Sequence, residues 1–112
     1  MTVKFSVITP SFQQGNFIER TIQSVLCQDV SYEYIVCDGG SQDSTCEILA
    51  KYDDFIIWTS EPDEGQADAV NKGIQKTSGD IIAWINSDDI YYPKALKKVE
   101  SCFEENPEIE VV

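Results

Sequence analysis

Four short apolar segments alternate with longer stretches in which apolar residues recur every three or four positions. The short segments are rich in Val, Ile and aromatic residues, which is typical of strands buried on both faces. They cover residues Val3–Thr9, Tyr34–Cys37, Phe55–Thr59 and Ile81–Ile85. We therefore predict four strands, each followed by a helix.

The helical stretches carry capping residues, a glycine or a proline where a helix is expected to begin or end. These are Asn16 with Glu19 as a capping box for the first helix, Asp43 or Ser44 for the start of the second, Gly79 for a left-handed end of the third, and Pro93 for the start of the fourth. The fourth helix is expected to turn Leu96, Val99 and Phe103 inward, and residues Glu108–Val112 to begin a further strand. Alternating strands and helices predict a three-layer α/β/α fold with a mainly parallel sheet.

Composition and charge narrow the function classes. The chain carries 8 Lys and Arg against 20 Asp and Glu, a net charge of −12. A nucleic-acid partner is excluded on this ground, because it would require a basic face. No apolar run approaches the ~18 residues of a membrane span, and residues 1–4 lack the pattern of a signal peptide. We therefore expect a cytoplasmic protein.

Four cysteines are spread along the chain, which has no histidine. They form no CxxC pair, which argues against a zinc site. Because a cytoplasmic chain keeps its thiols reduced, we predict buried free thiols rather than disulfides. The cysteines concerned are Cys27, Cys37, Cys46 and Cys102.

Acidic residues follow the ends of the predicted strands. In a parallel sheet these ends share one edge, where ligands bind. Six carboxylates gathered there repel one another unless a cation joins them, and oxygen ligands without His suit Mg²⁺ or Mn²⁺. The residues are Asp38, Glu61, Asp63, Glu64, Asp88 and Asp89. We assign function to Asp38 and to the Asp88–Asp89 pair, and expect Asp63 and Glu64 only to cap a helix or face solvent.

Other phosphate-binding folds fit poorly. The first predicted strand is followed by neither GxGxxG nor GxxxxGK[ST], which argues against a dinucleotide-binding domain and a P-loop. A receiver domain or an Asp-nucleophile phosphatase would need acidic residues after the first strand, where Thr9-Pro10-Ser11 stands.

The chain resembles the family-two inverting glycosyltransferases, which have the Rossmann-like GT-A fold, and most closely their bacterial O-antigen and capsule branch. The segments that carry the resemblance are Val7–Phe12 with Ile18–Leu26, Glu33–Thr45, Asp63–Gly73, and Ser78–Asp80 with Asn86–Asp89. With the alternation of strands and helices, the resemblance predicts the strand order 3-2-1-4. It also implies that residues 1–112 are the nucleotide-sugar-binding portion, with the acceptor-binding part and the catalytic base beyond Val112.

The resemblance further implies roles for individual residues. The nucleoside would be held by Thr9, Pro10, Phe12 and Asp38, with Asp38 accepting the uracil imide N–H. Asn71 and Lys72 would lie near the nucleotide, although Lys72 is also spaced for a helix ion pair with Asp68. Asp88 would face the ribose or sugar, and Asp89 would bind Mn²⁺ or Mg²⁺. Phe12 departs from the Tyr of many relatives, and Val70 stands where some have an Arg.

The implied function is the inverting, metal-assisted transfer of a hexosyl or N-acetylhexosaminyl group from a nucleotide sugar, with UDP as the favoured nucleotide. The acceptor would be a saccharide or a lipid-linked molecule, which would bring the full-length enzyme to the inner face of the membrane. These 112 residues alone are expected to be inactive. An alternative is a nucleotide-sugar binding or regulatory module without transfer activity. We also expect exposed apolar surface near Trp84, Tyr91 and Tyr92, and hence a homodimer.

Overall fold

The computed structural model describes residues 4–105, with side chains as far as residue 102. Its centre is one sheet of four parallel strands, in the order β3-β2-β1-β4. The strands are β1 (Lys4–Ser11), β2 (Ser31–Asp38), β3 (Ile57–Ser60) and β4 (Ile81–Trp84). The predicted strand order is therefore confirmed.

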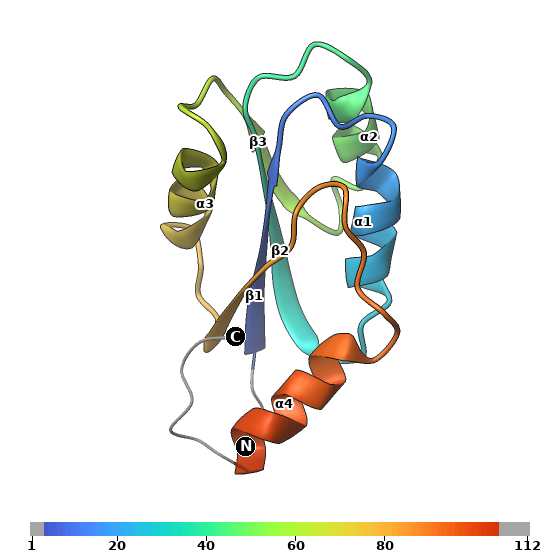
Figure 1. The fold of residues 1–112 in the computed structure, drawn as a ribbon, viewed down its shortest axis with the longest axis vertical. Helices are drawn as coiled ribbons and strands as arrows, with labels where there is room; N and C mark the ends of the chain where they lie inside the picture. The colour runs from blue at the N-terminus through green and yellow to red at the C-terminus, as the bar shows by residue number, and fades with distance from the viewer. Residues whose placement is uncertain (1–3, 106–112) are drawn as a thin grey trace.

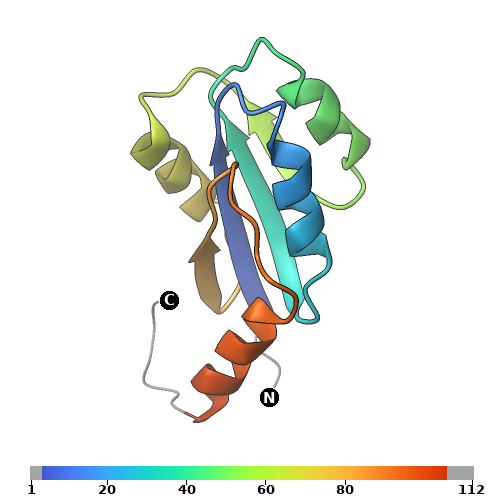
Figure 2. The same cartoon turned by 45° about the vertical axis from the view of Figure 1, so that its right-hand side comes forward.

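Helices cover both faces of this sheet, as the alternation predicted. They are α1 (Ile18–Leu26), α2 (Thr45–Lys51), α3 (Gln66–Ile74) and α4 (Ala95–Glu105). Figure 1 shows α1 and α2 together on one face and α3 alone on the other. Figure 2 shows α4 near the opposite end of the sheet from the loops that follow β1 and β2. No helix within residues 4–105 is long and apolar enough to cross a membrane.

The hydrophobic core lies mainly between the sheet and the pair α1 and α2. There Phe5, Val7, Ile22 and Tyr34 are fully or almost fully buried. The two edge strands depart from the prediction, since β3 has two half-buried residues between exposed ends and β4 alternates buried and exposed positions. They lie at the sheet margins, where one side of the strand has no neighbour. The burial of these two strands therefore depends on their place at the margin of the sheet, and their apolar sequence alone does not determine it.

The predicted capping box at the start of α1 is wrong. No side chain caps α1, and the carbonyl of Gln14 accepts a hydrogen bond from the N–H of Ile18 at 2.8 Å. Glu19 is drawn to the neighbouring helix, because its carboxylate accepts the Tyr52 hydroxyl at 2.7 Å. That bond lowers the pKa of Glu19. Asn16 is exposed.

Asp43, and not the side chain of Ser44, supports the start of α2. Its Oδ1 accepts the N–H of Thr45 at 2.9 Å, and its Oδ2 accepts the N–H of Gly15 at 2.9 Å. Hydrogen bonds from Thr45 and Gly15 lower the pKa of Asp43. The same carboxylate thereby joins the loop after β1 to the loop after β2.

The predicted left-handed stop at Gly79 is also wrong, because α3 ends at Ile74 with Gln75 in a right-handed conformation. Gly79 instead lets the chain approach β1 closely. Its N–H donates to Ser6 Oγ at 2.8 Å, and an added Cβ would lie 2.8 Å from the Lys4 carbonyl oxygen.

Helix α4 begins at Ala95 and not at Pro93, because Lys94 has a φ of 65°, which a right-handed helix excludes. Leu96 is buried and Val99 is half-buried against the core, as predicted. The side chain of Phe103 and the strand predicted over residues 108–112 lie outside what the structure describes.

None of the four cysteines, all within the described residues, forms a disulfide, which agrees with the prediction of reduced thiols. Their burial differs from the prediction, because Cys27 and Cys102 are exposed and Cys46 is half-buried. Cys37 alone is buried among the four, and burial raises the pKa of its thiol.

Candidate functional site

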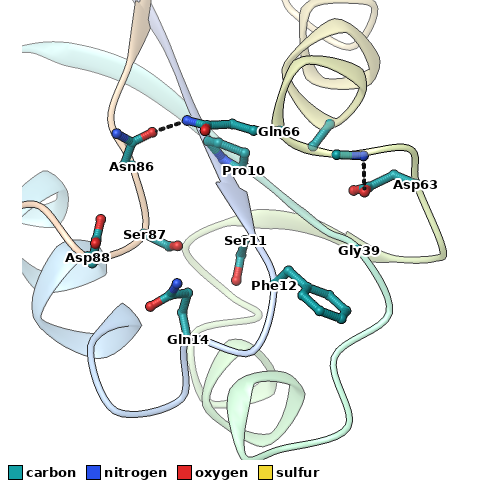
Figure 3. A pocket seen from close by; sticks show the side chains of 12 residues that line it. Pro10, Ser11, Phe12, Gln14, Gly39, Asp63, Gln66, Asn86, Ser87 and Asp88 are labelled. Atoms are coloured by element: carbon teal, nitrogen blue, oxygen red, sulfur yellow. Dashed lines mark hydrogen bonds between the residues drawn. The ribbon is translucent and has the colours of Figure 1, made fainter.

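A pocket of about 600 Å³ opens where the loops after β1, β2 and β4 meet the start of α3. It lies at the carboxyl ends of the strands, the edge at which the sequence predicted a ligand. Figure 3 shows the side chains of its lining converging from these elements. The lining residues are Pro10, Ser11, Phe12, Gln14, Gly39, Asp63, Gly65, Gln66, Ala69, Asn86, Ser87 and Asp88. Two carboxylates belong to this lining, with no Lys or Arg.

Ser11 is the last residue of β1 and lines the pocket between Ser87 and Phe12, as Figure 3 shows. Its carbonyl accepts the Gly39 N–H at 2.8 Å, which ties the loops after β1 and β2 together. Its side-chain hydroxyl is buried and has no hydrogen-bond partner within the described chain. Since a buried hydroxyl normally has a partner, the Ser11 hydroxyl is placed to meet a ligand. No local sequence signal marks Ser11, because an unpartnered atom is visible only in the folded chain.

Asp38 ends β2 and is 2% exposed, but it does not line the pocket. Its Oδ2 accepts the N–H groups of Gly40 at 3.1 Å and Ser41 at 2.7 Å, and the Ser60 hydroxyl at 2.8 Å. Its Oδ1 accepts the Ser41 hydroxyl at 2.6 Å. The carboxylate thus holds the loop after β2 and joins it to the end of β3.

Asp63 lines the pocket beside Gly39, as Figure 3 shows. Its Oδ1 accepts the Gly65 N–H at 3.0 Å within the loop before α3, but no side chain caps α3 itself. A Cβ added at Gly39 would lie 2.9 Å from Asp63 Oδ2 and 3.0 Å from Oδ1. The sequence prediction gave Asp63 a structural role only, and its place in the lining is a further feature of the fold.

The residues of the Thr-Pro loop divide between the two faces of the sheet. Pro10 and Phe12 line the pocket, and the Phe12 ring is 58% exposed. Thr9 is fully buried outside the lining, and its hydroxyl lies 2.7 Å from the hydroxyl of Tyr34 in a hydrogen bond. Burial raises the pKa of Tyr34. The Thr9 side chain is therefore part of the core on the α1 face.

Asn71 and Lys72 of α3 lie outside the pocket lining. Lys72 Nζ lies 3.4 Å from Glu61 Oε1 and 3.5 Å from Asp68 Oδ2, and donates to the Pro62 carbonyl at 3.3 Å. Burial acts to lower the pKa of Lys72, but the charges of Asp68 and Glu61 raise it overall. The helix ion pair that the spacing allowed is present, and the Asn71 side chain is exposed.

The loop after β4 places two exposed carboxylates next to each other. Asp88 lines the main pocket, and Asp89 lines a smaller neighbouring pocket of about 370 Å³. Asn86 lines both pockets. The hydroxyl of the buried residue Thr21 anchors this loop on α1, because it donates to the carbonyl of Ser87 at 3.0 Å and also contacts the carbonyl of Asp89.

These two carboxylates fit one mode of divalent-metal binding. Residues 4–105 contain no group of three or more Cys, Asp or Glu that could enclose an ion. Mg²⁺ is commonly held by one or two carboxylates together with substrate phosphates, and so needs no such enclosure. Asp88 and Asp89 can supply those carboxylates at the rim, while no lining Lys or Arg competes for them.

Comparison with known proteins supplies the family. The model of glycosyl transferase family 2 matches residues 6–112. An uncharacterized glycosyltransferase of Mycobacterium tuberculosis is 42% identical over 87 residues, which are 75% of this chain and 33% of that protein. The chain therefore spans about a third of the length of that relative.

Solved structures agree with this assignment. Staphylococcus aureus TarS 1-349 in complex with UDP-GlcNAc has a TM-score of 0.83 at 26% identity, over 93% of this chain and 32% of that one. Glucosyl-3-phosphoglycerate synthase of M. tuberculosis, in complex with Mn²⁺, UDP and glucosyl-3-phosphoglycerate, has a TM-score of 0.64 at 28% identity, over 76% and 33% of the two chains. The four-stranded parallel sheet is that of the GT-A nucleotide-sugar transferases. The chain belongs to glycosyl transferase family 2.

Proposed function

We propose that this chain holds the donor nucleotide of an enzyme that transfers a sugar from a UDP-sugar to a saccharide or lipid-linked acceptor, with inversion. The transferred group would be a hexosyl or N-acetylhexosaminyl residue of a bacterial surface polysaccharide such as an O-antigen or capsule. TarS bound to UDP-GlcNAc, similar over 93% of this chain, supports the choice of nucleotide. A lipid-linked acceptor would place the whole enzyme at the inner face of the membrane.

The pocket is the observation that supports this proposal, because one of its ends suits the base of a nucleotide sugar and the other suits the diphosphate. Its volume of about 600 Å³ lies within the usual range for small-molecule sites. Phe12 offers an aromatic ring at one end, where a base can stack. Asp88 lies at the opposite end, next to Asp89. We place the base near Phe12 and the diphosphate near Asp88.

Asp89, with Asp88 beside it, would hold Mn²⁺ or Mg²⁺ at this second end. A diphosphate brings two to three negative charges to a rim that already carries carboxylates, and Lys72 is engaged with Glu61 and Asp68. When bound, the ion would offset those charges and stabilise the diphosphate as a leaving group. Thr21 would keep the loop after β4 in place for this task through its contacts with Ser87 and Asp89.

The remaining predicted residues keep supporting roles in the proposal. Pro10 shapes the pocket beneath the nucleoside, and Thr9 contributes through its backbone, since its side chain is bonded to Tyr34. Asp38 stays as the predicted acceptor of the uracil imide N–H. Asn71 and Lys72 stay as predicted contacts that would form only if their side chains reorient toward the nucleotide. No residue of this chain is assigned as the base that deprotonates the acceptor.

Titration calorimetry with UDP tests the proposal. Binding should be much tighter in Mn²⁺ than in a chelator, and Asp89→Asn should weaken it about 10–100-fold in Mn²⁺, the usual effect of losing a charged partner. Asp54→Asn, at an exposed site outside the pocket, is the matched control and should bind as the wild type does. Equal UDP affinity in chelator and in Mn²⁺ would refute the metal assignment. No UDP binding in Mn²⁺ would refute the proposed function.

A further inference from the structure

Three polar side chains in and just after α1 face the segment that follows β4. They are Thr21, Ser24 and Gln28, which we call the α1 polar row. Thr21 and Ser24 belong to α1, and Gln28 follows the last residue of the helix by two positions. Their spacing of three and four residues places them on one side of the helix. Figure 2 shows the segment after β4, in orange, running beside α1.

The first two members of the row bond the main chain on both sides of the loop carboxylates. The Thr21 hydroxyl donates to the carbonyl of Ser87 at 3.0 Å and also contacts the carbonyl of Asp89. Ser24 Oγ accepts the Tyr91 N–H at 3.1 Å and donates its own hydrogen to the Thr21 carbonyl at 2.7 Å. The backbone is therefore held immediately before and immediately after the carboxylates.

Gln28 holds the far end of the same segment from a buried position. Its side chain is 5% exposed. Nε2 donates to the carbonyls of Tyr92 and Ser24, each at 3.0 Å, and Oε1 accepts the Leu96 N–H at 2.9 Å. Leu96 lies in the first turn of α4, where a backbone N–H has no partner within the helix. One amide group thus joins α1, the loop and the start of α4.

The carboxylates of Asp88 and Asp89 depend on this backbone for their direction. Both side chains are exposed, and within the described chain neither carboxylate accepts a hydrogen bond or pairs with Lys or Arg. The α1 polar row lines neither of the two pockets. It can act on the carboxylates only through the main chain from which they extend. Holding that main chain at both ends limits the positions that the two carboxylates can take.

We infer that the α1 polar row positions Asp88 and Asp89 for the divalent ion, with Gln28 as a positioning residue that lies outside both pockets. The inference rests on the proposed function and deepens it, because it names residues that act on the metal end without touching the metal. Groups that orient metal ligands commonly cost about 10–100-fold in metal affinity when they are replaced. Here they orient the ligands through the backbone of the loop.

Gln28→Met tests the inference, because Met has a similar length but no N–H donor and only a weak sulfur acceptor. Calorimetry should show that UDP in Mn²⁺ binds this variant about 10-fold or more weakly than the wild type. Uridine, which has no phosphate to meet the ion, should bind both chains equally in an NMR titration. A merely structural role for Gln28 would lower the stability to urea and leave both affinities of the folded chain unchanged.

Gln23→Met is the matched control on the same helix. Gln23 is exposed, and its Nε2 donates to the Tyr52 hydroxyl at 3.1 Å and not to the loop after β4. This variant should bind UDP in Mn²⁺ as the wild type does. Thr21→Val and Thr21→Ser form a second test, in which Val removes the hydroxyl and should weaken UDP binding about 10-fold, while Ser keeps the hydroxyl and should restore it.

Wild-type UDP affinity in Mn²⁺ for a folded Gln28→Met variant would overturn the inference and leave the proposed function standing. An equal loss of uridine binding would also overturn it, because the effect would not be confined to the metal end. If circular dichroism shows that Gln28→Met does not fold, Thr21→Val decides in the same way. A wild-type chain that binds no UDP in Mn²⁺ would instead refute the proposed function, and the inference with it.

Discussion

Replacement of Asp38 by Ala should destabilise the whole fold, because this carboxylate is a hub for the loop after β2. The side chain is 2% exposed and accepts four hydrogen bonds within 3.1 Å. Two come from the backbone N–H groups of Gly40 and Ser41, and two from the hydroxyls of Ser41 and Ser60. Ala removes the acceptor from all of them at once.

The size of the effect follows from what the donors can do afterwards. Each hydrogen bond to a charged group contributes about 1.5–3 kcal/mol, and each orphaned buried donor costs about 1–3 kcal/mol. The two hydroxyls can rotate toward water, while the two backbone N–H groups cannot, and loss of the buried charge returns part of its desolvation penalty. We expect a net loss of about 2–4 kcal/mol. That is a large fraction of the ~6–17 kcal/mol expected of a domain of 112 residues.

Urea unfolding followed by circular dichroism measures this loss. Ser60→Ala removes one donor and should cost about 1 kcal/mol, and Asp38→Asn, which keeps one acceptor oxygen, should fall between the two. Asp54→Asn, exposed and outside the network, is the control and should match the wild type within about 0.5 kcal/mol. An Asp38→Ala variant as stable as this control would refute the assignment of Asp38 as the positioning residue of the loop.

Two further predictions concern acid stability and self-association. The folded-state pKa of Asp43 is lowered by the hydrogen bonds from Thr45 and Gly15, so its stabilising effect is present above the ordinary value of 3.8 and is lost as pH falls through the lowered value. Asp43→Asn should therefore flatten the loss of stability below about pH 4 in urea unfolding; identical pH profiles would contradict this. Ile82 and Trp84 on edge strand β4 are 38% and 51% exposed, and we expect this apolar edge to support dimerisation at high concentration. Light scattering should show a dimer that Ile82→Lys converts to monomer, and a strictly monomeric wild type would contradict the prediction.

The sheet was predictable because alternation leaves few topologies open. Four short β-branched segments separated by helical patterns require parallel pairing, and with the family resemblance they predicted the observed order β3-β2-β1-β4. Burial of the outer strands was not predictable from the same pattern. Trp84 is half-exposed because α3 packs over β1 and β2 and leaves this face of edge strand β4 open, an arrangement that depends on the order of the whole sheet.

The position of the pocket was predictable for a similar reason, since strand ends share one edge. Pro10, Phe12 and Asp88 line it as expected. The direction of individual side chains was not predictable, because partners distant in sequence decide it. Thr9 turns to Tyr34 of the neighbouring strand, and that hydrogen bond has no local sequence signal.

Asp38 and Asp63 also show that partners distant in sequence decide what a side chain contacts. Asp38 has the sequence context of a ligand-binding residue, and in the folded chain its two oxygens also accept hydrogen bonds from Gly40, Ser41 and Ser60. Asp63 has the context of a helix cap, but no side chain caps α3; its Oδ1 accepts the Gly65 N–H in the preceding loop, and the residue lines the pocket. The close approach of Asp63 to Gly39, where an added Cβ would lie 2.9 Å from Asp63 Oδ2, has no local sequence signal.

The central claim is that the pocket at the carboxyl ends of the strands binds a nucleotide. An ¹⁵N–¹H correlation titration of the chain with UDP and Mg²⁺ tests it most directly, because each backbone amide reports on its own surroundings. The account predicts saturable shifts at Ser11, Gly39, Gly65 and Ser87, all in the pocket lining, and none at Leu96 of α4. Unshifted pocket amides at saturating UDP, or shifts centred on α4, would contradict it.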